Sequence, residues 1–195
     1  MVGVIEKSKH KQYVQINRDG KIFYQLREVG SDKIEEEIES FGIKYLDQLA
    51  ATNFNSKQTA FFKYQRDNAK LCHIEKLKNI AKNIDTNNPR LKQCYRNSVE
   101  VVLRNQNQNI KYCEGYMFFQ GIPIEHSWNK IGDRYFDVTA EGPLKKLDTS
   151  KNEYISVMEI DSVELSKYLI ETEQYGPFIV DKFLSSQKDQ SNTDQ

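Results

Sequence analysis

Residues 123–139 read PIEHSWNKIGDRYFDVT. Two runs with alternating side chains flank Gly132 and Asp133, which predicts a β-hairpin with a two-residue turn. Because side chains alternate between the faces of a strand, this register places four residues on one face: His126, Trp128, Asp137 and Thr139. His126 and Asp137 become diagonal neighbours, about 7–8 Å apart at the backbone, so their side chains can meet. A shift of one residue would separate them onto opposite faces.

The regions on either side of this hairpin predict an α+β fold. We expect a hairpin at 12–26, helices at 31–49, 56–84, 91–105 and 162–171, and strands at 110–119, 124–131, 134–140 and 153–159. Helices come first and an antiparallel meander follows, which is typical of an α+β protein. The expected architecture is an N-terminal hairpin with helices, then a helix packed on an antiparallel sheet.

The same pattern suggests three regions within one compact domain. Residues 1–85 would form the hairpin and a two-helix region, and 86–184 would form the core. The polar stretch 185–195 has no hydrophobic periodicity, so we expect a disordered tail.

Composition narrows the classes of function. The 195 residues contain 28 basic and 28 acidic side chains, and the mean hydropathy is -0.73. A formal net charge of zero gives no electrostatic reason to expect nucleic acid. No apolar run approaches the roughly 18 residues of a membrane span, and the first residues are charged too soon for a signal peptide. Three cysteines without a CxxC pair favour free thiols in a cytoplasmic protein.

Cys94 is the best candidate for a nucleophile. A helix dipole stabilises a thiolate only near the first turn, so Cys94 suits this role if its helix opens near Gln93 rather than at Pro89. Together with His126 and Asp137 it would supply a nucleophile, a base and a residue that orients the base.

The other thiols are weaker candidates. If Phe119 pairs with Ile124, Cys113 shares the face of His126 and is an alternative thiol, but a thiol in mid-strand lacks a helix end to lower its pKa. Cys72 and His73, expected on a helix, would point about 100° apart and form no pair. Ligand-type spacing for zinc is missing, so we expect no metal and no cofactor.

Four segments resemble a known pattern: CYRNS at 94–98, YCEGY at 112–116, PIEHSWN at 123–129 and FDVT at 136–139. They resemble uncharacterised bacterial and phage proteins that read C-x-x-N-A, Y-V-E-G-Y, P-I-x-H-A-W-N and V-D-P-T. The wider relatives are the transglutaminase-like, papain-related cysteine enzymes, in which a helix with the cysteine faces strands with the histidine and aspartate. The matching segments cover less than a third of the chain.

The resemblance implies roles for individual residues. It makes Cys94 the nucleophile, His126 the general base and Asp137 its orienter. Gln93 would help to form an oxyanion hole with backbone N–H groups, and Asn97 would brace the helix against a neighbouring segment. Glu114 and Trp128 would be supporting residues, with Gly115 opposite the indole. Four positions depart from the pattern without touching the triad: Ser98, Cys113, Ser127 and Val138.

The expected function is therefore acyl transfer from an amide bond through a thioester on Cys94, with a protein or peptide as substrate. Water as acceptor would make the protein a peptidase, amidase or deamidase, and an amine would make it a transglutaminase. The alternative is a non-catalytic binding or inhibitor protein on the same scaffold. Lysines at 70, 76, 78 and 82 are interspersed with Asp67 and Glu75, which indicates a solvated face rather than a nucleic-acid site.

Overall fold

A computed structural model describes residues 10–52, 54–80, 83–142 and 152–193. The strands are β1 (Lys11–Arg18), β2 (Lys21–Glu28), β3 (Ile34–Ile38), β4 (Lys70–Cys72), β5 (Ile110–Phe119), β6 (Ile122–Ile131), β7 (Arg134–Phe136) and β8 (Glu153–Ile160). The helices are α1 (Phe41–Ala51), α2 (Ser56–Asn68), α3 (Leu77–Ile80), α4 (Cys94–Arg104), α5 (Val138–Glu141), α6 (Ser162–Thr172) and α7 (Ile179–Thr193), with a 3-10 turn η1 (Gln106–Gln108). The mixture of helices with antiparallel sheets confirms the α+β class.

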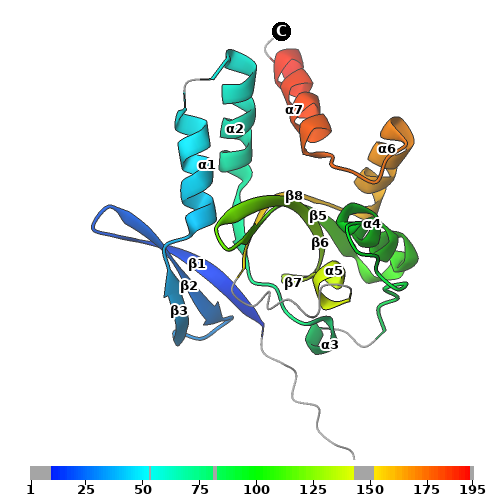
Figure 1. Ribbon diagram of the computed structural model, residues 1–195, viewed down its shortest axis with the longest axis horizontal. Helices are drawn as coiled ribbons and strands as arrows, with labels where there is room; N and C mark the ends of the chain where they lie inside the picture. The colour runs from blue at the N-terminus through cyan, green and yellow to red at the C-terminus, as the bar shows by residue number, and fades with distance from the viewer. Residues whose placement is uncertain (1–9, 53, 81–82, 143–151, 194–195) are drawn as a thin grey trace, which may run out of the picture.

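The larger sheet has the order β4-β8-β5-β6-β7 and every neighbouring pair is antiparallel. It bends into an arc (Figure 1). Its two edges approach each other just beyond β4, where Ile74 forms a bridge with Tyr135 and the Glu75 N–H donates to the Tyr135 carbonyl at 2.9 Å. The smaller sheet, β1-β2-β3, lies beside it (Figure 1).

Buried side chains form two clusters on the two faces of the larger sheet. The main cluster lies between the sheet and the helices and includes Leu46, Val99, Tyr112, Ile155, Leu165 and Phe178. The second cluster consists of Cys72, Cys113, Met117, Trp128 and Tyr154. Alternation along β5 explains the division, because Tyr112 and Cys113 point to opposite faces.

The hairpin expected at 12–26 and the two-residue turn expected at Gly132 and Asp133 are both confirmed. Asp19 and Gly20 join β1 to β2, and Gly132 and Asp133 join β6 to β7 with Ile131 opposite Arg134. Gly132 has a φ of 56°, a left-handed conformation that glycine adopts without steric cost.

The register between β5 and β6 differs from the expectation. Phe119 pairs with Ile122 rather than Ile124, so the turn is two residues shorter. The shift is even, and Cys113 therefore keeps the face of His126. Gly115 faces His126, and the expectation that it faces Trp128 is wrong.

Two predicted helices are interrupted by strands. The first part of the helix expected at 31–49 is β3, and α1 begins only after Ser40. The helix expected at 56–84 ends at Asn68 and gives way to β4, so the expectation that Cys72 and His73 lie on a helix is wrong. Strand pairing overrides the helical pattern in both places: β3 pairs with the neighbouring β2, and β4 pairs with β8, a distant segment of the chain.

Two further boundaries were wrong. The strand expected at 134–140 ends at Phe136, because Asp137 caps a short helix, α5. Part of the tail expected to be disordered belongs to α7, which extends to Thr193. Strand β4 comes from the region 1–85, yet it forms an edge of the core sheet.

Candidate active site

Cys94 is the first residue of α4, and Gln93 precedes it as the N-cap residue. The helix therefore opens where a thiolate benefits from its dipole. Asn97 holds the preceding loop in place: its Oδ1 accepts from the Arg90 N–H at 2.9 Å, and its Nδ2 donates to the Arg90 carbonyl at 2.8 Å and to Thr139 Oγ1 at 2.9 Å. Asn97 thus braces the helix start, in the manner expected from the sequence.

His126 and Asp137 meet at the far end of the β6–β7 hairpin. His126 Nε2 lies 2.7 Å from Asp137 Oδ2, and both side chains are buried. The other carboxylate oxygen, Oδ1, accepts from the N–H groups of Thr139 at 2.9 Å and Ala140 at 3.0 Å. Burial alone would raise the pKa of Asp137, but the charge and hydrogen bond of His126 keep this pKa below its ordinary value.

Cys94 and His126 also share a hydrogen bond. Because Nε2 is engaged with Asp137, Nδ1 is the ring nitrogen that remains for the sulfur. Burial would raise the pKa of Cys94, yet the hydrogen bond and charge of His126, with the N–H groups of Ser127 and Tyr95, lower it. Burial would lower the pKa of His126, but Asp137 and Cys94 raise it. These opposite shifts favour a thiolate–imidazolium pair.

Aromatic rings fix the imidazole from the sides. The ring of Trp128 stacks on His126 with centroids 6.2 Å apart, and Tyr154 packs edge-on against Trp128 at 5.3 Å. Tyr154 also donates its hydroxyl to Asp137 Oδ2 at 3.0 Å. Trp128 therefore has the supporting place expected for it, while the contribution of Tyr154 was missed. The sequence predicted a strand at 153–159, but no local pattern indicates which strand it pairs with, so the position of Tyr154 could not be predicted.

The other two residues expected to support the site, Gln93 and Glu114, have different surroundings. Gln93 lies beside Cys94, and its Oε1 is buried without a hydrogen-bond partner in the part of the chain that the structure describes. Glu114 lies opposite Ser127, on the face covered by α4, but its carboxylate accepts from the N–H groups of Phe178 and Ile179, at 2.9–3.1 Å. Because these hydrogen bonds occupy the carboxylate at the start of α7, Glu114 supports the fold rather than the reacting groups.

Neither other cysteine resembles Cys94. All three thiols are free, but Cys72 and Cys113 are buried in the second cluster. Burial raises the pKa of Cys72 to about 12 and that of Cys113 well above its ordinary value. Cys113 shares a face with His126, but it packs at Trp128, two residues further along β6.

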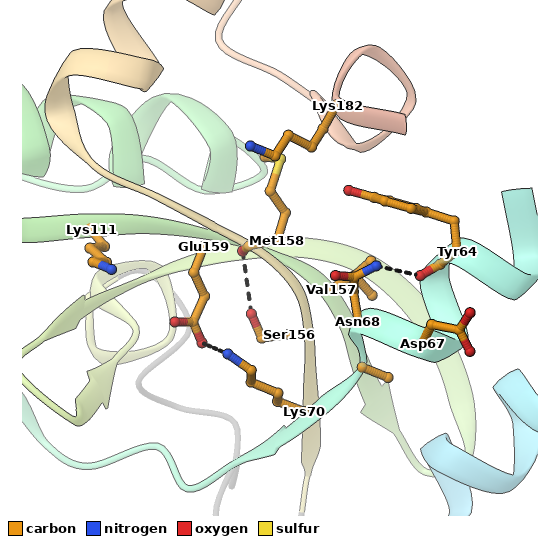
Figure 2. Close-up of a pocket in the computed structure, with 11 residues that line it drawn as sticks. Tyr64, Asp67, Asn68, Lys70, Lys111, Ser156, Val157, Met158, Glu159 and Lys182 are labelled. Carbon is orange, nitrogen blue, oxygen red and sulfur yellow. Dashed lines mark hydrogen bonds and ion pairs between the residues drawn. The ribbon is translucent and has the colours of Figure 1, made fainter. Parts of the chain in front are cut away.

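A separate hollow of about 450 Å³ lies between α2, β8 and α7 (Figure 2). Its charged side chains include Lys70, Lys182 and Glu159. Lys70 Nζ is 3.9 Å from Glu159 Oε1, and Lys182 pairs with Glu164, so these charges compensate one another. None of the triad residues lines this hollow.

No family model matches the chain, and no curated protein and no solved structure matches it either. Across residues 10–52, 54–80, 83–142 and 152–193, no helix combines the length and apolar character needed to cross a membrane. Within those ranges no group of three or more His, Cys, Asp or Glu side chains is arranged to hold a metal ion.

Proposed function

We propose that the protein is a cysteine-dependent enzyme that transfers the acyl group of an amide bond through a thioester on Cys94. The observation that carries the proposal is the chain of contacts from Cys94 to His126 to Asp137, with Cys94 at the first position of α4. The arrangement fits a transglutaminase-like, papain-related core, with a cysteine helix packed on the strand that bears the histidine.

The residues would act in sequence. The Cys94 thiolate attacks the amide carbonyl, and the oxyanion accepts hydrogen bonds from N–H groups at the start of α4 and from the Gln93 side chain. His126 then gives its proton to the leaving amine, and a thioester remains on Cys94. His126 next removes a proton from the acceptor, water or an amine, which attacks the thioester and regenerates the thiolate. Asp137 keeps the imidazole oriented and stabilises its positive charge throughout.

Thiol alkylation tests the activation of Cys94. At pH 6.5 a cysteine with an ordinary pKa of about 8.5 is only about 1% ionised, so iodoacetamide should react with Cys94 up to about 100-fold faster than with an ordinary exposed thiol. We expect His126→Ala to abolish most of this advantage. The labelled residue is identified by peptide mass spectrometry, and Cys94→Ser serves as the blank.

A turnover assay then separates the acceptors. An unfolded protein substrate is incubated with a fluorescent primary amine, and both amine incorporation and release of ammonia or new amino termini are followed. Amine incorporation would identify a transglutaminase, and hydrolysis alone would identify a peptidase, amidase or deamidase. Reaction of Cys94 at the same rate in wild type and His126→Ala would contradict the proposal and favour a non-catalytic binding protein.

A further inference from the structure

We propose that Glu125 selects substrates with a basic side chain next to the reacting amide. This inference rests on the proposed function, because it assigns a substrate class to the same site. The chemistry that it requires is an ammonium or guanidinium group held by one carboxylate beside tyrosine rings.

The position of Glu125 on β6 brings it to the side of Cys94. It precedes His126, and its side chain lies on the opposite face, the face of Ser127. Ser127 contacts α4 through Ser98 Oγ, at 3.2 Å, and its N–H donates to the Cys94 sulfur. Glu125 lies two residues before Ser127 on the same face, towards the β5–β6 turn, and so lies beyond the start of α4.

The carboxylate of Glu125 is available to a ligand. The side chain is exposed, and no hydrogen bond or ion pair joins it to any residue that the structure describes. Its charge helps to raise the pKa values of three neighbours, Tyr95, Glu114 and Tyr116. The two tyrosines are neutral, so the negative potential of this region comes from the Glu125 carboxylate, and a bound cation would neutralise it.

The site itself adds to that potential. A thiolate on Cys94 and a protonated His126 compensate each other, and the carboxylate of Asp137 then leaves one negative charge. With Glu125, two negative charges lie beside the position of the substrate, which favours a cationic substrate over an anionic one.

Two tyrosines lie next to the carboxylate, one buried and one partly accessible. Tyr116 lies directly opposite Glu125 in the β5–β6 ladder and is buried in the main cluster, where Tyr45 packs edge-on against it with centroids 6.4 Å apart. Tyr95 follows Cys94 on α4 and is half-buried. A lysine or arginine side chain can place its apolar stem on the accessible part of Tyr95 and its charge at the Glu125 carboxylate.

Charged thiol reagents measure this potential without a known substrate. Cationic and anionic methanethiosulfonates of similar size each transfer a sulfenyl group to the Cys94 thiolate, which forms a disulfide and releases a sulfinate. We expect the ratio of cationic to anionic rates at Cys94 to exceed the ratio of the same two reagents with a small free thiol, which corrects for their intrinsic reactivities. The ratio of cationic to anionic rates should fall about threefold to tenfold in Glu125→Gln, because one negative charge near the reacting sulfur is removed. It should fall further in Glu125→Lys, which reverses the charge.

The selection itself is tested with two peptidyl chloromethyl ketones that differ only in Lys or Glu beside the reactive group. The Lys peptide should inactivate the wild type faster, and Glu125→Lys should reverse the order. Asp19→Asn, an equivalent change in the exposed β1–β2 turn, should leave both ratios unaltered.

The two proposals fail separately. If Cys94 is not activated, iodoacetamide reacts slowly in every variant, while the ratio of charged reagents still reports on Glu125. An unchanged ratio in Glu125→Gln, or equal rates for the Lys and Glu peptides, would overturn the selection by Glu125 even with Cys94 fully active. Tryptophan fluorescence checks that each variant is folded.

Discussion

At the scale of single residues, Asp137 performs two functions with two oxygen atoms. Oδ2 receives His126 and the Tyr154 hydroxyl, whereas Oδ1 caps α5 through the N–H groups of Thr139 and Ala140. The cap fixes the carboxylate in the direction of the imidazole. The residue that orients the proposed base is therefore itself oriented by the backbone.

Substitutions of Asp137 separate these functions. Asparagine retains an oxygen that can cap α5, but it lacks the charge that raises the pKa of His126. We expect Asp137→Asn to fold with a loss of about 1–3 kcal/mol and to lose most of the rapid alkylation of Cys94 at pH 6.5. Asp137→Ala should be less stable than Asp137→Asn in urea, because it also loses the cap. Equal alkylation in wild type and Asp137→Asn would show that the aspartate does not sustain the pair.

Strand alternation and a two-residue turn are local rules, and they predicted that His126 and Asp137 lie together. The contact forms although Asp137 lies beyond the end of β7 rather than inside a strand. The same rules say nothing about Tyr154, because its place opposite Met117 depends on the pairing of β8 with β5. The start of α4 at Cys94 was open for a similar reason, since it depends on the contact of Asn97 with the Arg90 loop.

At the scale of elements, carboxylates begin four of the helices that the structure describes. Asp161 and Asp137 cap α6 and α5 from the preceding residue. The sequence predicted the first of these helices, whereas it placed Asp137 in a strand. Glu153 accepts from the N–H groups of Phe41 and Gly42 at the start of α1, and Glu114 does the same for α7. These two act across 111–112 and 64–65 residues, so their contacts could not be predicted locally. The start of α1 also has a local cap, because Ser40 Oγ accepts from the Ile43 N–H at 3.1 Å.

The contribution of Glu114 to the stability of the fold, through its contacts at the start of α7, should depend on pH. Burial raises the pKa of Glu114 to about 7, despite the hydrogen bonds from Phe178, Tyr112 and Ile179. A raised pKa means that the folded state binds the proton more tightly than the unfolded state. The contribution of Glu114 to stability is therefore fully present below the ordinary carboxyl pKa and is lost as the pH rises through about 7.

Comparison with Glu114→Gln isolates this effect, because the amide does not titrate. The free energy of unfolding of wild type relative to Glu114→Gln should fall between pH 5 and pH 8 by on the order of 3 kcal/mol. Urea unfolding at several pH values measures it. A difference that is independent of pH would mean that Glu114 keeps an ordinary pKa.

Gly115 is required where β5 approaches β8. The register shifts between Glu114 and Gly115, and a Cβ on Gly115 would lie 2.0 Å from the Ile155 carbonyl oxygen. We expect Gly115→Ala to cost about 3 kcal/mol or more, because backbone must move to admit the methyl group. Gly132→Ala is the control: it has open space but a positive φ, so it should cost only about 1–2 kcal/mol. Equal losses of stability would contradict the role of Gly115.

At the scale of the whole molecule, the region 1–85 contributes a strand to the core sheet. Helices followed by strands predicted the α+β class correctly, since periodicity distinguishes the two kinds of element. The expected separation at residue 85 overlooked β4, whose three residues pair with β8 and form an edge of the core sheet. A strand this short has no periodicity to detect, and its partner lies more than 80 residues away.

This topology predicts cooperative unfolding. The closure of the larger sheet joins Ile74, from the first half of the chain, to Tyr135, and α2 contributes Tyr64 to a ring contact with Phe183 of α7, at 5.4 Å. Loss of the N-terminal region would therefore expose one edge of the sheet and one side of α7. We expect the full chain to unfold in urea as a single two-state transition.

Two probes test that expectation because they report on different regions. Trp128 is the single tryptophan and is fully buried beside His126, so its fluorescence follows the core sheet. Far-ultraviolet circular dichroism follows the helices, to which α1 and α2 contribute many residues. The two curves should have the same midpoint, and Leu71→Asp in β4 should move both to lower urea by the same amount. If this substitution moved only the circular dichroism curve, the N-terminal helices would form an independent unit, and β4 would contribute nothing to the stability of the sheet that holds His126.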